Sequence, residues 1–78
     1  MIQEENFLKQ VCELLSLQEI VDINTRFESL EEYDSLSQMT IRAWLEEAFS
    51  IKVSIQKVDD FKTFLDLYIF INTHGTNL

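Results

Sequence analysis

Ser35 lies between an aspartate and a leucine, directly before an amphipathic stretch, and its hydroxyl is the first candidate for chemistry in this chain. Two uses fit a serine at this place. As an N-cap, its oxygen accepts a backbone N–H from the following helix, and Asp34 could fill the same role. In the other use the hydroxyl is exposed and carries a phosphodiester, which would face the free N–H groups of the helix start. The local pattern leaves both uses open.

Acidic side chains surround Ser35 in the sequence. They are Glu28, Glu31, Glu32, Asp34, Glu46 and Glu47, and Arg42 is the only base between residues 27 and 51. The whole chain has 14 acidic and 6 basic residues, giving a formal net charge of −8 at pH 7. Nucleic acids and anionic membranes would be repelled by this charge. The composition therefore favours a protein partner with a basic docking face.

The residues that hydrolytic and metal enzymes need are scarce. The chain has one histidine, His74, and one cysteine, Cys12, so neither a catalytic triad nor a zinc site can be assembled. Gly75 is the only glycine, which excludes a glycine-rich phosphate loop. Glu46 and Glu47 are adjacent and would point about 100° apart on a helix, so they cannot serve as a paired acid and base. We predict no catalytic activity, no metal and no intramolecular disulfide.

The N-terminal sequence MIQEENF carries acids where a signal peptide would carry bases, and no apolar run approaches the roughly 18 residues of a membrane span. We therefore expect a cytoplasmic protein that does not enter the membrane.

Apolar residues recur at helical spacing in three stretches, and the chain contains no proline. The stretches predict a first helix over about 2–17, a second from Leu36 to Phe49, and a last over about 59–71, followed by a frayed tail at 72–78. Their main stripes are Phe7, Val11 and Leu14; Ile41, Leu45, Ala48 and Phe49; and Phe61, Leu65 and Tyr68.

The ends and connections of these helices are less regular. Asp59 or Asp60 is the expected N-cap of the last helix. Residues 18–34 fit neither helix nor strand and predict a long ordered loop, a kind of segment that is often functional. The segment SIKVSIQKVDD alternates like a strand, but no second stretch offers a partner strand. We therefore predict an extended connector with a short helix near 55–60.

Three longer helices, one short helix and a long loop between the first and second helices indicate an all-α fold, a small antiparallel four-helix bundle. With 78 residues the chain is too short for two cores, so we expect a single domain over 1–78 and a monomer.

The spacing of residues around Ser35 resembles that of acyl carrier proteins, over about residues 7 to 71. In that family a loop phenylalanine lies eight residues before the serine, an aspartate and a leucine flank it, and a Leu-Glu-Glu follows ten to twelve residues later. The matching residues here are Phe27, Asp34, Ser35, Leu36, Leu45, Glu46, Glu47, Phe49 and Ile51.

The resemblance implies that Ser35 bears 4′-phosphopantetheine, attached covalently from coenzyme A by a separate phosphopantetheinyl transferase. The thiol of the arm would hold an acyl or aminoacyl thioester, and partner enzymes would load and transfer it. Positions that match docking residues of the family are Asp34, Leu36, Glu46 and Glu47. Candidate neighbours of the cargo are Met39, Ile41 and Trp44.

Some residues depart from the common carriers of fatty-acid synthesis. Tyr33 precedes the aspartate, as in stand-alone carriers of specialised pathways, and Arg42 lies in a region that is usually more acidic. Both are candidate determinants of partner choice. The bulk of Trp44 favours a short or polar cargo. Fatty acyl, polyketide, aminoacyl and D-alanyl carriers share the motif, so the motif does not distinguish among these cargoes. The alternative function is an acidic helical interaction module that never carries an arm.

Overall fold

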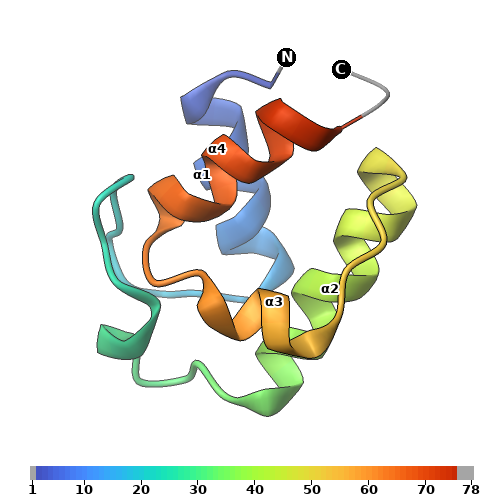
Figure 1. Cartoon of the computed structure of the whole chain (residues 1–78). Coiled ribbons are helices and arrows are strands. Elements are labelled where there is room, and N and C mark those ends of the chain that lie inside the picture. Colours follow the sequence, from blue (N-terminus) through green and yellow to red (C-terminus); the bar gives the residue numbers. More distant parts are fainter. Residues whose placement is uncertain (1, 76–78) are drawn as a thin grey trace.

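The structure is a computed structural model that describes residues 2–75. This part of the chain contains four α-helices and one short 3₁₀-helix (Figure 1). The elements are α1 (Glu4–Leu14), the 3₁₀-helix η1 (Phe27–Ser29), α2 (Ser35–Phe49), α3 (Ile55–Asp60) and α4 (Phe64–His74). No β-strand is present within residues 2–75, where one isolated bridge joins Arg26 and Thr63. The all-α fold of four helices is confirmed. Across the same residues, no helix is long and apolar enough to cross a membrane.

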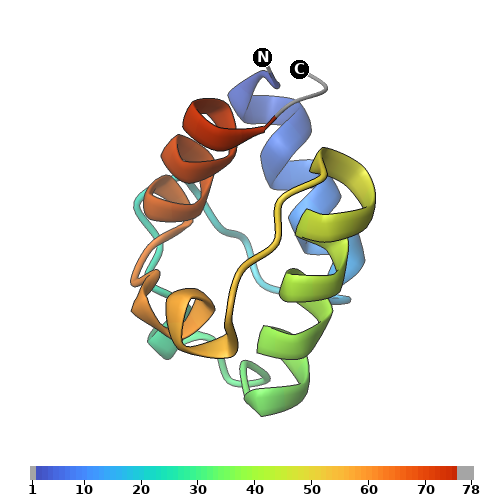
Figure 2. The same cartoon turned by 45° about the vertical axis from the view of Figure 1, so that its right-hand side comes forward.

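The helices surround one core. In both views α1 runs in the opposite direction to α2, α4 crosses α1 at a steep angle, and the short α3 packs beside α2 (Figures 1 and 2). The buried core residues are Phe7, Val11, Phe27, Leu30, Ile41, Leu45, Phe49, Ile51, Val58, Phe61, Phe64, Leu67 and Ile71. All three predicted stripes contribute to this core. Four residues of the predicted stripes are not among the buried core residues, because Ala48 is exposed and Leu14, Leu65 and Tyr68 are only partly buried.

Helix α1 is shorter than the predicted helix over 2–17. It ends at Leu14 because Ser16 adopts a left-handed conformation (φ 54°). The N–H of Ser16 donates to the carbonyl of Glu13 (3.2 Å) and that of Leu17 donates to the carbonyl of Cys12 (2.9 Å). This pair of bonds is a Schellman motif, which satisfies carbonyls of the last turn and stops the helix.

The start of α4 corrects the predicted N-cap. Asp59 and Asp60 are the last two residues of α3, and the N-cap of α4 is Thr63. Thr63 and Asp66 form a capping box, in which each side chain accepts from the other residue's backbone N–H. The expected tail also begins too early. Residues 72–74 belong to α4, and 76–78 lie outside the described residues. The predicted short helix near 55–60 is confirmed as α3.

The long loop between α1 and α2 is held in place by the start of α4. The N–H of Phe27 donates to the carbonyl of Lys62 (2.9 Å), and the N–H of Phe64 donates to the carbonyl of Thr25 (3.1 Å). A third bond joins the N–H of Leu65 to the carbonyl of Ile23 (2.7 Å). This pairing anchors η1 against the start of α4.

Candidate functional site

Ser35 is the first residue of α2 and its side chain is exposed. Within residues 2–75 its hydroxyl takes part in no hydrogen bond. The neighbouring Ser37 differs, because its hydroxyl donates to Asp34 Oδ1 (3.2 Å) and contacts the carbonyl oxygen of Glu32 (3.3 Å). Of these two serines in the first turn of α2, only Ser35 presents an uncommitted hydroxyl to solvent.

Asp34 is the N-cap of α2. Its Oδ1 accepts from the backbone N–H of Ser37 at 3.0 Å, and its carbonyl accepts from the N–H of Gln38 at 3.1 Å. Hydrogen bonds from the backbone and side chain of Ser37 favour the ionised carboxylate and lower the pKa of Asp34. The question left open by the sequence is thereby answered, because the aspartate caps the helix and leaves the Ser35 hydroxyl free.

Tyr33 points inward and supports the loop beneath this site. Its ring stacks on Phe27, with ring centroids 5.0 Å apart and planes 20° apart. The hydroxyl is buried without a hydrogen-bond partner in the described part of the chain. Burial raises the pKa of Tyr33; the adjacent Gln38 amide partly offsets this rise without forming a well-aligned bond, and the charge of Asp59 adds to it. An unsatisfied buried hydroxyl costs up to about 1–3 kcal/mol.

A cavity of about 450 Å³ adjoins Ser35. It lies between η1, the start of α2 and the connection from α3 to α4, and its lining residues are Phe27, Glu28, Tyr33, Asp34, Ser35, Gln38, Asp59, Phe61 and Lys62. Its volume is within the range of about 300 to 1,000 Å³ found for small-molecule sites.

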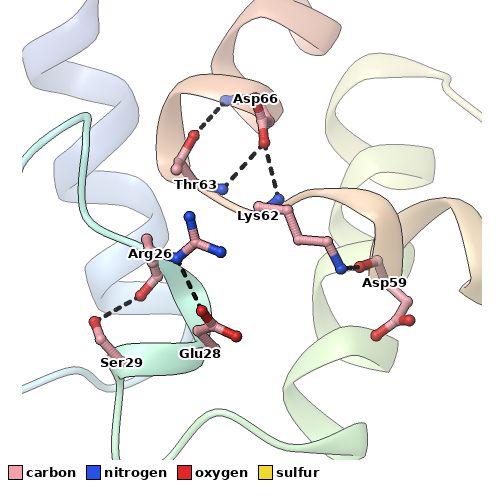
Figure 3. Close-up of polar contacts among 7 residues, drawn as sticks. All are labelled: Arg26, Glu28, Ser29, Asp59, Lys62, Thr63 and Asp66. Atoms are coloured by element: carbon pink, nitrogen blue, oxygen red, sulfur yellow. Dashed lines mark hydrogen bonds and ion pairs between the residues drawn. The ribbon is translucent and has the colours of Figure 1, made fainter.

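Hydrogen bonds fix the polar walls of this cavity. Gln38 Nε2 donates to Asp59 Oδ1 at 2.8 Å, and Lys62 Nζ donates to the carbonyl of Asp59 at 3.2 Å. Figure 3 shows Lys62 reaching toward Asp59, while Arg26 and Glu28 face one another on the η1 side at 2.9 Å. Sequence reasoning missed Gln38, Asp59 and Lys62 as site residues. They carry no local motif, and only the fold brings them to Ser35.

The exposed face of α2 combines apolar and acidic side chains. Leu36 is 70% exposed and Met39, one turn further along, is 57% exposed. Glu46 and Glu47 are exposed at the other end of the helix. Arg42 has a structural contact, because its Nε donates to the carbonyl of Val53 at 3.0 Å and so ties α2 to the segment that precedes α3.

The three candidate cargo residues do not share a cavity. Ile41 is fully buried in the core. Met39 and Trp44 line an open groove of about 350 Å³ between α2 and Leu14 of α1. Trp44 also packs edge-on against Phe49, with ring centroids 5.1 Å apart.

The residues that could support other chemistry are dispersed. In the described part of the chain, no three His, Cys, Asp or Glu side chains lie close enough together to hold a metal ion. His74 is exposed and its ring lies against Phe70, with centroids 4.5 Å apart. Cys12 is half-buried, and burial raises the pKa of its thiol, which lowers the fraction of reactive thiolate.

An exposed serine with a free hydroxyl beside a cavity of this size fits a long arm attached through a phosphodiester. In a comparison with protein families, residues 6–71 match the family described as "Phosphopantetheine attachment site". The chain belongs to this family. Searches of curated proteins and of solved structures found no match.

Membership in the phosphopantetheine-attachment family confirms the resemblance to acyl carrier proteins. The group that this family carries is covalent 4′-phosphopantetheine. Arm-bearing domains of this kind act as carriers.

Proposed function

We propose that Ser35 is the attachment residue for 4′-phosphopantetheine and that the protein carries an acyl or aminoacyl thioester between partner enzymes. The observation that carries this proposal is the free, exposed Ser35 hydroxyl at the start of α2, in a chain whose family is defined by such an attachment. Capping by Asp34 supports it, because the helix start needs no bond from Ser35.

Attachment needs a separate phosphopantetheinyl transferase. The serine oxygen forms a bond to the phosphorus on the pantetheine side of the coenzyme A pyrophosphate, and the P–O bond to adenosine 3′,5′-bisphosphate breaks. The proton of the hydroxyl goes to a base of the transferase, since the only carboxylate next to Ser35 in sequence, Asp34, is a helix cap with a lowered pKa. The carrier itself catalyses no step.

The docking face of the proposed carrier consists of Asp34, Leu36, Glu46 and Glu47. Leu36 supplies exposed apolar area beside the attachment serine, and the carboxylates would attract a basic partner surface. Tyr33 and Arg42 would influence partner choice indirectly, because they shape the loop and the α2–α3 segment. We further propose that the carrier is cytoplasmic. The departures from fatty-acid carriers at Tyr33 and Arg42 support a role in a specialised pathway.

The deciding experiment measures intact mass after the purified chain is treated with coenzyme A and a broad-specificity phosphopantetheinyl transferase. We expect a mass gain of one phosphopantetheine for the wild type and none for Ser35→Ala. Ser37→Ala is the matched control, since it removes a hydroxyl in the same helical turn that is already hydrogen-bonded, and it should keep the gain. Absence of a gain in the wild type, or a gain that survives Ser35→Ala, contradicts the proposal.

The docking face can be tested by the rate of the same modification. Leu36→Ala should lower kcat/KM for the transferase severalfold. Ile69→Ala on α4 is the control, because it removes a similar exposed apolar side chain (53% exposed) away from α2. Equal rates for the two variants would refute a role for Leu36 in docking. Salt-sensitive partner binding by a chain that never gains the arm would instead indicate the interaction module.

A further inference from the structure

The cavity beside Ser35 differs in its lining from two other large hollows of the described chain. A groove of about 490 Å³ between α3 and α4 is lined by Ile69, Phe70 and other residues, and the groove of about 350 Å³ on α2 is lined by Met39 and Trp44. Neither includes Ser35. A flexible group attached to Ser35 has the cavity of about 450 Å³ as its immediate neighbour.

The walls of this cavity are of two kinds. Phe27 and Phe61 are almost fully buried and present aromatic surface, with the ring of Tyr33 stacked on Phe27. Gln38 and Lys62 are polar groups with exposed or half-exposed side chains. Lys62 is the only cation among the lining residues.

The polar groups also have unused hydrogen-bonding capacity. The Tyr33 hydroxyl has no partner in residues 2–75, and the adjacent Gln38 amide donates to Asp59. A ligand that displaces the Gln38–Asp59 hydrogen bond would let the Gln38 amide turn toward the buried Tyr33 hydroxyl and give it a partner. The cavity is therefore prepared for a ligand with hydrogen-bonding groups.

The proximal half of a phosphopantetheine arm has matching chemistry. It begins with an anionic phosphodiester. A carbon with two methyl groups follows, then a carbon with a hydroxyl group, and then the first amide. Attachment to Ser35 holds the negative phosphodiester close to the negative carboxylate of Asp34. A neighbouring cation would reduce the repulsion between these two groups. The uncharged hydroxyl and amide suit the acceptors of this acidic cavity better than an anion would.

We infer that the proximal half of the arm rests in this cavity when the carrier is not engaged by a partner. Lys62 is the positioning residue for the phosphodiester, Gln38 and Asp59 bind the hydroxyl and first amide, and the geminal methyl groups contact the aromatic wall. The inference rests on the proposed attachment at Ser35. It places the arm on the η1 side of α2 and not in the groove that Met39 and Trp44 line.

Nuclear Overhauser effects test the location of the arm. The protein is modified with coenzyme A labelled with ¹³C in the geminal methyl groups, and intact mass is measured first. Absence of a mass gain refutes the proposed function and the inference together. On the modified protein we expect effects from the labelled methyls to ring protons of Phe27, Tyr33 or Phe61. Nuclear Overhauser effects from the methyls to Met39 or Trp44, or the absence of effects to the rings of Phe27, Tyr33 and Phe61, overturn the inference and leave the proposed function intact.

Thermal unfolding tests the role of Lys62. The measured quantity is the rise in melting temperature between the unmodified and the modified form of each variant, which removes any effect of the substitution on the fold itself. Lys62→Gln should lose at least half of the rise seen in the wild type. Lys9→Gln makes the same charge change on α1, does not line any of the three hollows described above, and should keep the full rise. Equal rises for both variants overturn the assignment of Lys62.

Discussion

The backbone N–H and the hydroxyl of Ser37 both donate to Asp34 Oδ1, at 3.0 and 3.2 Å, across the residue that bears the free hydroxyl. As a result, neighbouring residues have different roles. Asp34 accepts a backbone N–H at the start of α2, and the hydroxyl of Ser35 stays available to a partner enzyme. A serine that capped the helix itself would have to give up its hydrogen bond during modification.

The pKa of Asp34 predicts a pH-dependent contribution to stability. Because the folded-state pKa of Asp34 lies below the ordinary aspartate value of 3.8, the stabilisation is complete above that value and is lost as the pH falls through the folded pKa. Asp34→Asn still caps the helix but does not titrate. The wild type should melt at a higher temperature than Asp34→Asn near pH 6, and the difference should shrink below about pH 4. A difference that is constant over this range would contradict the prediction.

The capping box at the start of α4 should make a measurable contribution to the fold. Thr63→Ala removes the side-chain acceptor for the N–H of Asp66. We expect the free energy of unfolding to fall by about 1 kcal/mol, as for other lost N-caps. Urea denaturation measures the change, and Thr63→Ser, which keeps the hydroxyl, should lose much less. Equal losses for the two variants would show that the methyl group and not the cap matters.

The buried hydroxyl of Tyr33 separates the requirements of the fold from those of the site. In the unmodified protein, Tyr33→Phe keeps the stack on Phe27 and removes only an unsatisfied polar atom. The free energy of unfolding should therefore stay the same or rise by up to about 1 kcal/mol. Tyr33→Ala also removes the ring contact and should lose about 1 kcal/mol or more. A clear loss in Tyr33→Phe would mean that the hydroxyl has a stabilising partner in solution.

The formal net charge of −8 predicts that salt stabilises the protein at neutral pH. Between about 0.1 M and about 1 M sodium chloride the screening length falls from roughly 10 to 3 Å, which weakens repulsion among the carboxylates. We expect the melting temperature to rise over this range at pH 7. The rise should be smaller near pH 4, where the carboxylates carry less charge. A melting temperature that falls with salt at pH 7 would refute this electrostatic account.

Features of this protein that depend on local sequence pattern could be predicted without the structure. Helical periodicity placed α2 and its buried residues Ile41, Leu45 and Phe49, and the spacing from Phe27 to Ser35 indicated the family. These features follow from side chains a few residues apart on one helix or loop, so they can be read without knowing the rest of the fold.

The tertiary structure decided what depends on distant segments. Asp59, Asp60 and Thr63 are all residue types that can cap a helix. In the structure Thr63 is the N-cap of α4, at the point where residues 23–27 pair with the start of that helix. The cavity beside Ser35 has the same origin, because Gln38, Asp59 and Lys62 come from different elements. Hydrogen bonds and packing between segments far apart in the chain determine both the N-cap of α4 and the cavity. Helical periodicity reports only on residues close together in sequence, so it does not predict these contacts.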